Sequence, residues 1–249
     1  MKKIRRKYRL SLLLVTVWGL ALAYSFWDAP FAFDGHELRQ TQWFPTPELP
    51  PDTVSAAPSV ATADTSHHVI LFFGDSMVEG LHFRFRQYAA ANHFDLCTVV
   101  WYGSSTQLWA ETDTLEHFIR RFRPTYVVLS LGSNELFLKD LRKQETYVDR
   151  ILRKIGGRPY CWIGPPNWKR DTGINRLIRR KTGRQRFFES SRLSLERRKD
   201  GAHPTRQAAA RWMDSIAVWM ESPLCDHPLQ MKPPNGKDTK ATLVLLSPP

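Results

Sequence analysis

The chain contains a serine, a histidine and an aspartate in settings that suit nucleophilic catalysis. Ser76 ends a Gly-Asp-Ser motif directly after an apolar run, and His203 ends an Asp-Gly-Ala-His motif that begins at Asp200. A serine hydroxyl becomes a nucleophile when a base takes its proton and an acid orients that base. The three-residue spacing predicts His203 as the base and Asp200 as the orienting acid, because a short glycine-containing loop can fold the carboxylate back onto one imidazole nitrogen.

Each of these residues also has a purely structural interpretation. Ser76 is placed where a serine commonly caps a helix N-terminus, and Asp200 can simply precede a helix in a surface loop. The other histidines suit the role of base less well. His82 follows Ser76 by six residues on the expected helix, a rotation of about 600° that points it away from Ser76.

Gly103 and Asn134 are the candidate donors for an oxyanion. Gly103 follows an apolar segment, where the absence of a Cβ lets its N–H approach a ligand closely. Asn134 follows another apolar segment, and its amide is a neutral donor that does not titrate near the base. The alternative is that both are ordinary turn residues.

The elements that would position these residues alternate between strand and helix. Apolar runs at 69–73, 98–102, 126–131 and 160–163 predict strands, with a weaker one at 186–188. Amphipathic stretches at 77–91, 111–122, 144–155 and 204–220 predict helices. This alternation predicts an α/β fold, a three-layer α/β/α sandwich with a mostly parallel sheet of about five strands. All the candidate residues follow strands or precede helices at the carboxyl edge of that sheet, where ligands bind.

In their order along the chain, these motifs resemble the SGNH (GDSL-type) hydrolase superfamily over residues 68–221. The resemblance implies Ser76 as the nucleophile, His203 as general base and acid, and Asp200 as the orienting acid. It further implies an oxyanion hole formed by the N–H groups of Ser76 and Gly103 and the amide of Asn134, with no metal or other cofactor. The chain departs from the family pattern at Met77, where leucine is frequent, and at Glu135, where aspartate is common.

Composition divides the chain into four parts. Residues 1–27 combine six basic side chains with the apolar run from Leu10 to Trp27, about 27 Å long as a helix. They predict either an uncleaved signal anchor or a cleaved signal peptide, and both place the rest outside the cytoplasm. Residues 28–66, with six prolines, predict a poorly ordered stalk. The hydrolase domain is expected over 67–221, and a disordered proline-rich tail over 222–249.

The formal charge of +12 is concentrated at the N-terminus and in a basic stretch, residues 169–199, with twelve Lys or Arg against three acidic residues. The basic stretch predicts either contact with an anionic envelope glycan or lipid headgroups, or simply a solvated helix face. Nucleic acid is an improbable partner for an exported domain. Three cysteines exclude a complete disulfide framework, and we expect Cys97, Cys161 and Cys225 to be buried thiols.

These observations predict a serine esterase, membrane-anchored or secreted, that hydrolyses acyl esters of a cell-envelope carbohydrate, with acetyl as the expected acyl group. Two other functions stay open. The same triad can pass its acyl group to a sugar hydroxyl, as a polysaccharide O-acetyltransferase does, or the fold can serve a non-catalytic envelope binding protein. The acyl chain, the alcohol and the oligomeric state are not indicated by the sequence.

Overall fold

The computed structural model describes Thr16 and residues 31–33, 36–38, 63–234, 236 and 241–248. The chain forms two compact units, Met1–Ala57 and Pro58–Pro249. In the first unit, β1 (Phe31–Phe33) pairs antiparallel with β2 (His36–Leu38), so the expected stalk contains a two-stranded hairpin. No helix within the described ranges has the length and apolar character to cross a membrane. The signal-anchor prediction for residues 1–27 falls outside these ranges, apart from Thr16.

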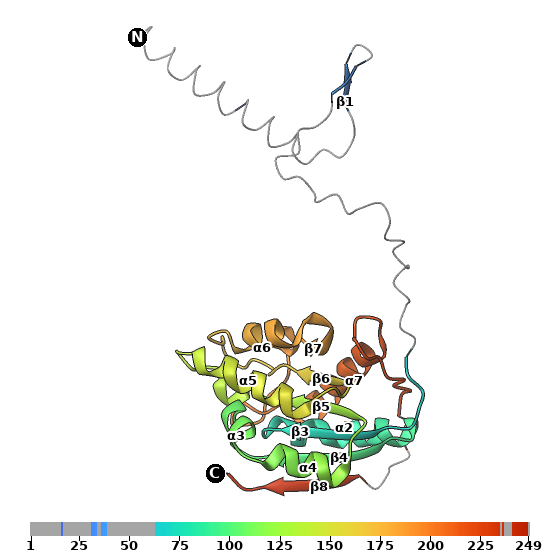
Figure 1. Cartoon of the computed structure of the whole chain (residues 1–249), viewed down its shortest axis with the longest axis vertical. Helices are drawn as coiled ribbons and strands as arrows, with labels where there is room; N and C mark the ends of the chain where they lie inside the picture. Colours follow the sequence, from blue (N-terminus) through green and yellow to red (C-terminus); the bar gives the residue numbers. More distant parts are fainter. Residues whose placement is uncertain are drawn as a thin grey trace. The chain divides into compact units, whose positions relative to one another are not determined.

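The second unit is an α/β domain whose elements alternate along the chain (Figure 1). Its strands are β3 (Val69–Gly74), β4 (Asp95–Trp101), β5 (Tyr126–Ser130), β6 (Tyr160–Ile163), β7 (Phe187–Phe188) and β8 (Thr242–Leu246). Its α-helices are α2 (Met77–Asn92), α3 (Thr106–Glu111), α4 (Thr114–Phe122), α5 (Arg142–Ile155), α6 (Ile174–Thr182) and α7 (Arg206–Glu221). The predicted α/β class is confirmed.

The six strands form one parallel sheet in the order β7-β6-β5-β3-β4-β8. Strands β4 to β7 with β3 follow the order of flavodoxin-type doubly wound sheets, with β8 added beside β4. The connection after β3 leads to one neighbour, and the connection after β4 crosses to the other side of β3. A ligand site is expected at this reversal, outside the carboxyl ends of β3 and β5.

Helices cover both faces of the sheet. Alternate residues of β3 point to opposite faces, because side chains in a strand alternate. Ile70 and Phe72 pack into the core formed with α2 and α7, whereas Leu71 and Phe73 pack into the core formed with α3, α4, α5 and α6. The continuous apolar run of β3 therefore fills two cores at once, as expected for a parallel strand buried on both sides.

The prediction of a disordered tail over 222–249 is wrong for the described part of that segment. β8 pairs in parallel with β4 and extends the sheet to six strands instead of about five. Cys225, Leu229 and Met231 are buried. The short apolar run 243–246 has no periodicity of its own that distinguishes a strand, and its partner lies about 145 residues earlier in the chain.

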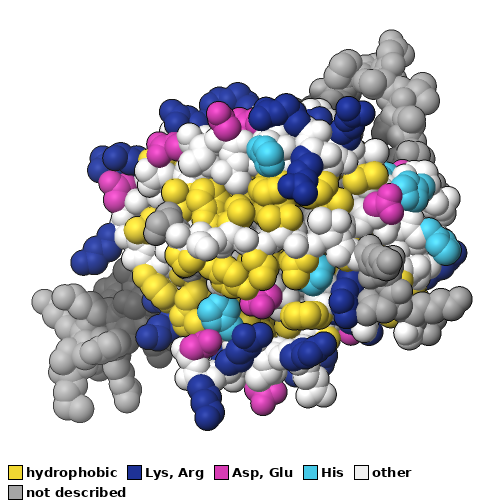
Figure 2. Space-filling model, turned by 90° about the horizontal axis from the view of Figure 1, so that it is seen from below, with side chains coloured by type: hydrophobic (Ala, Val, Ile, Leu, Met, Phe, Trp, Pro, Cys, Tyr) yellow, Lys and Arg dark blue, Asp and Glu magenta, His cyan; other side chains and the backbone are white. Residues whose placement is uncertain are grey.

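β8 is an edge strand, and its outer side chains remain partly exposed. Leu243 is 38% and Leu245 54% exposed. Figure 2, which views the domain from the side of β8 and α4 at the bottom of Figure 1, shows hydrophobic side chains gathered in bands between Lys and Arg side chains. The charged borders and the short strand are features that limit edge-to-edge association.

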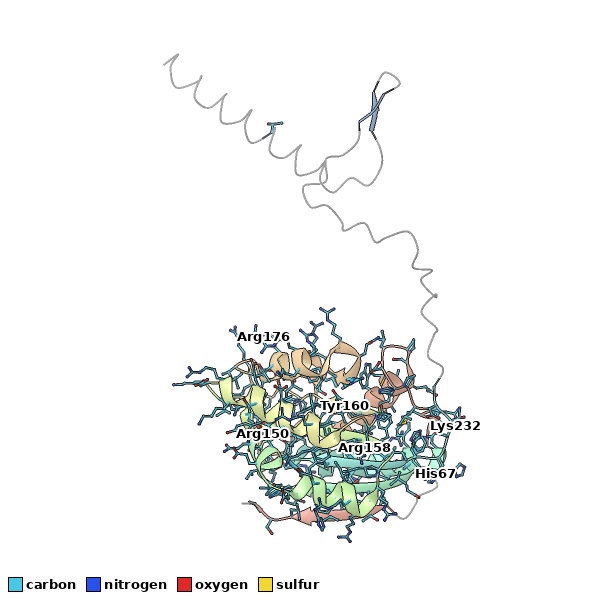
Figure 3. The ribbon with its side chains drawn as sticks, viewed as in Figure 1. His67, Arg150, Arg158, Tyr160, Arg176 and Lys232 are labelled. Carbon is cyan, nitrogen blue, oxygen red and sulfur yellow. The ribbon has the colours of Figure 1, made fainter. Side chains whose placement is uncertain are left out.

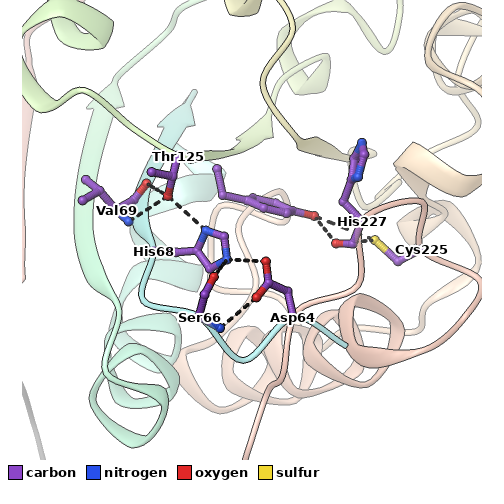
Figure 4. A network of polar contacts seen from close by, with 8 residues as sticks. Asp64, Ser66, His68, Val69, Thr125, Cys225 and His227 are labelled. Carbon is purple, nitrogen blue, oxygen red and sulfur yellow. Dashed lines mark hydrogen bonds and ion pairs between the residues drawn. The ribbon is translucent and has the colours of Figure 1, made fainter. Parts of the chain in front are cut away.

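The domain also begins earlier than residue 67. Asp64 forms a parallel bridge with Leu229, and its N–H donates to the carbonyl of Pro228 at 2.7 Å. His68 is buried and contacts Asp64 (Nε2–Oδ2, 3.1 Å) and Thr125 (Nδ1–Oγ1, 3.0 Å), as Figure 4 shows. The described part of the domain therefore reaches from residue 63 to residue 248, without residues 235 and 237–240.

Two helical regions differ in detail from the sequence prediction. The expected helix over 111–122 is observed as α4, which begins at Thr114, and the prediction missed α3, which precedes it and ends where Thr112 is extended. α6 lies within the basic stretch, for which the sequence prediction gave no helix boundaries. The three cysteines are free and buried, as expected.

Candidate active site

Ser76, His203 and Asp200 form one continuous hydrogen-bonded line. Nε2 of His203 lies 2.8 Å from Oγ of Ser76, and Nδ1 of His203 lies 3.0 Å from Oδ2 of Asp200. Ser76 and His203 are separated by 127 residues in the chain. The fold thus brings together the three residues that the sequence predicted as a triad, in the order nucleophile, base and acid.

The position of Ser76 depends on the turn that leaves β3. Gly74 lies against β5 so closely that an added Cβ would be 1.9 Å from the carbonyl oxygen of Ser130. Only glycine permits this approach of backbone to backbone. The turn therefore places Ser76 at the carboxyl end of the central strand, directly beside the neighbouring strand that leads to Asn134.

Ser76 does not cap α2 with its side chain, although it occupies the N-cap position. The carboxylate of Asp75 accepts the hydrogen bond from Met77 N–H instead, at 3.0 Å. The hydroxyl of Ser76 is therefore free to contact His203. This finding removes the main structural alternative for the serine.

A tight loop presents Asp200 and His203. Oδ1 of Asp200 accepts from the N–H groups of Ala202 (2.8 Å) and His203 (2.9 Å), and Gly201 adopts φ +70°. These donors stabilise the ionised form and lower the pKa of Asp200 to about 2. The side chain is thus a carboxylate at any pH near neutrality, as its orienting role requires.

Arg197 anchors this loop, and the sequence contained no signal that singled it out among twelve basic residues. Its guanidinium donates to the carbonyl of Ala202 at 2.8 Å and to the carbonyls of Pro166 and Asn167 at 3.3 Å. It also forms an antiparallel bridge with Pro204. Arg197 therefore joins the loop carrying His203 to the loop that follows β6.

A hydrogen bond joins the loop that carries Gly103 to the loop that carries Asn134. Nδ2 of Asn134 donates to the carbonyl of Ser104 at 2.7 Å, which leaves the second amide hydrogen available. Gly103 is exposed with φ +69°. Within the described ranges, the N–H groups of Ser76 and Gly103 have no hydrogen-bond acceptor. Three unused donors thus come from the ends of β3, β4 and β5, as an oxyanion hole would require.

Two buried carboxyl groups hold these three loops together. Asp75, fully buried, accepts from Ser133 N–H at 3.3 Å, and Glu135 accepts from Thr106 N–H at the start of α3. Burial raises the pKa of Asp75 to about 7, assisted by the nearby Glu135 charge and opposed by the N–H donors. Burial also raises the pKa of Glu135. The sequence indicated only that Glu135 departs from a family pattern, and the structure gives it a bracing contact.

The structure places His82 in the core of the domain. His82 is buried and contacts Oγ1 of Thr98 at 2.9 Å, as a core histidine with a polar partner does. Among the residues that the structure describes, no three His, Cys, Asp or Glu side chains converge as metal ligands.

Comparisons with known proteins do not identify a family for this chain. No protein-family model matches the chain, and no curated protein matches it significantly in sequence.

Proposed function

We propose that the protein is a serine ester hydrolase of the SGNH type that acts through an acyl-serine intermediate. The observation that carries the proposal is the line of contacts from Ser76 Oγ through His203 to Asp200, at 2.8 and 3.0 Å. Distances of this size allow direct proton transfer between the hydroxyl and the imidazole.

In the proposed reaction, Oγ of Ser76 attacks the ester carbonyl while Nε2 of His203 takes the hydroxyl proton. The N–H groups of Ser76 and Gly103 and the amide of Asn134 stabilise the oxyanion that develops. The tetrahedral intermediate collapses, and the alcohol leaves with the proton from His203. Water then attacks the acyl-serine with His203 as base, which releases the acid and restores Ser76.

The proposal extends to the location and the substrate of the protein. The basic residues before the apolar run Leu10–Trp27 support a domain held outside the cytoplasm, with the membrane as its anchor or its point of export. Under this proposal the substrate is an acyl ester, with acetyl as the expected group, on a cell-envelope carbohydrate. Protease accessibility of the domain in intact cells tests the location.

The function is tested by hydrolysis of p-nitrophenyl acetate by the full chain and its variants. We expect Ser76→Ala and His203→Ala each to lower kcat by about 10³-fold or more, because each removes an essential member of the triad. His67→Ala is the matched control. Its side chain is 60% exposed and pairs with Asp95 at the opposite end of the sheet, so it should keep full activity.

The outcome separates three functions. Turnover that survives Ser76→Ala contradicts the acyl-serine mechanism. If Ser76 becomes acetylated but release requires an added sugar, the protein is an O-acetyltransferase. Folded protein in which a fluorophosphonate probe leaves Ser76 unlabelled would support a non-catalytic binding protein.

A further inference from the structure

A cavity of about 350 Å³ lies between α6 and the segment after β7, within the basic stretch. Four arginines line it: Arg170, Arg176, Arg179 and Arg192. Asp171 and Glu189 are its acidic residues. Figure 3 labels Arg176 on the side of the domain where α6 packs. None of the triad or oxyanion residues lines this cavity, so it is separate from the site described above.

Three of the four guanidinium groups are available to a ligand. Arg179 pairs with Glu189 at 3.4 Å. In the described part of the chain, Arg170, Arg176 and Arg192 have no carboxylate partner. Asp171 is already engaged, because its carboxylate accepts from Gly173 N–H (2.6 Å) and from the amides of Asn167 and Asn175 (2.9 Å each). The free arginines therefore give the cavity an unbalanced positive charge.

The lining distinguishes between kinds of anion. No apolar side chain lines the cavity; besides the charged residues it contains Thr172, Gly173, Asn175 and Ser191. A lipid tail would find little apolar surface there. The carboxylates of Asp171 and Glu189 disfavour a densely charged phosphate. The hydroxyl oxygens of Thr172 and Ser191, which also line the cavity, can accept hydrogen bonds from sugar hydroxyls. Arginine is well suited to bind a planar carboxylate through two hydrogen bonds. This combination fits a sugar that carries one carboxylate among several hydroxyls.

The cavity is connected to the catalytic loop by hydrogen bonds. Asn167 contacts Asp171 and Asn175 through its side chain, and its carbonyl accepts from Arg197. Arg197 in turn holds the carbonyl of Ala202 beside His203. The loop after β6 thus lines the cavity and is joined through Arg197 to the loop that carries His203.

We propose that this cavity is a subsite for a carboxylated sugar residue of a polymeric glycan, held by Arg170, Arg176 and Arg192. Its role in placing an ester of that glycan at Ser76 rests on the proposed function. The binding itself does not depend on it. The subsite assigns the basic stretch to an acidic glycan rather than to lipid headgroups.

The test measures binding by isothermal titration to the full-length Ser76→Ala protein in neutral detergent. The probes are a tetramer of β-1,4-linked glucuronic acid and cellotetraose, which differ only in carboxylate against hydroxymethyl groups. We expect the acidic tetramer to bind and cellotetraose to bind at least about tenfold more weakly. Arg176→Gln and Arg192→Gln should each weaken binding of the acidic tetramer about tenfold. Arg184→Gln, an exposed arginine of the same stretch outside the cavity, should change it less than twofold.

Several results would overturn the subsite. These are equal binding of the two tetramers, an equal loss with Arg184→Gln, or no binding of the acidic tetramer up to about 1 mM. Displacement of the tetramer by inorganic phosphate at equal concentration would show a phosphate site instead. Arginine-dependent binding to phosphatidylglycerol vesicles that exceeds binding to the tetramer would show a lipid surface. Binding without serine-dependent ester hydrolysis would keep the subsite and reject the proposed enzyme.

Discussion

At the scale of single residues, the orientation of His203 depends on the charge of Asp200. The carboxylate of Asp200 accepts hydrogen bonds from two backbone N–H groups and lies against Nδ1 of His203. A carboxylate is acceptor-only when ionised, and the histidine must therefore carry its proton on Nδ1. This leaves Nε2 as the acceptor that faces Ser76.

Asp200→Asn tests this arrangement. An amide at this position can present its NH₂ group to Nδ1, which would move the imidazole proton to Nε2 and prevent it from taking the proton of Ser76. We expect kcat to fall about 10³–10⁴-fold, as in other triads that lose the correct tautomer. Asp140→Asn is the control, because Asp140 is another exposed aspartate, with its pKa also lowered to about 2, by Arg142. Near-normal kcat in Asp200→Asn would contradict the role of Asp200.

The lowered pKa of Asp200 also predicts a pH dependence of stability. Its folded pKa of about 2 is below the unfolded value of about 3.9, so its stabilising effect is present above about pH 4. The effect is lost as the pH falls from about 4 through 2. Chemical denaturation at stepped pH should show a smaller loss of unfolding free energy over this window in Asp200→Asn than in the wild type.

At the scale of elements, the loops that carry the candidate residues are braced by contacts that lie outside the triad. Asp75 joins the turn after β3 to the loop after β5, Glu135 joins that loop to α3, and Arg197 joins the His203 loop to the loop after β6. Because catalytic geometry tolerates only small displacements, such braces affect turnover without touching the substrate.

Arg197→Met should lower kcat about 10–100-fold, because it frees the loop that positions His203. We expect KM to change little, since Arg197 contacts backbone carbonyls of the protein. Arg197→Lys should recover part of the loss by keeping one charged donor. Arg198→Met is the neighbouring control, because only the backbone of Arg198 contacts His203. A loss in Arg198→Met as large as that in Arg197→Met would argue against a specific positioning role.

At the scale of the whole molecule, segments far apart in the chain complete the domain. β8 covers the edge of β4, and Val244 and Leu246 pack against the core on the side of α4. The segment before β3 is joined to residues 228–230 through Asp64. The α/β domain therefore depends on parts of the chain whose composition resembles that of linkers.

Removal of residues 241–249 should lower the unfolding free energy by about 2–4 kcal/mol, through the loss of a strand ladder and of two partly buried apolar side chains. It also exposes the β4 edge, so we expect concentration-dependent association in light scattering. Leu245→Ser, which alters an exposed side chain of β8, should have little effect on stability. Unchanged thermal unfolding after the truncation would show that β8 adds nothing to the domain.

The alternation of strands and helices was readable from the sequence because a buried parallel strand is a continuous apolar run, as in Val69–Gly74. β8 was not readable, since a five-residue run followed by prolines resembles a tail until a partner edge is available. The boundary at Asp64 was missed for the same reason, because its partner is Leu229. Local sequence patterns do not show which distant segments of the chain pair with each other.

The sequence by itself determined which residues could do chemistry: a serine, a histidine with an aspartate three residues before it, and two donors at strand ends. Their types and local spacing suffice for this, because Asp200 and His203 interact within one short loop. Only the tertiary structure decided that Ser76 contacts His203 instead of capping α2, that Arg197 anchors the loop, and that three free arginines share a cavity. These contacts join residues brought together by the crossovers of the sheet, so their geometry exists only in the folded chain.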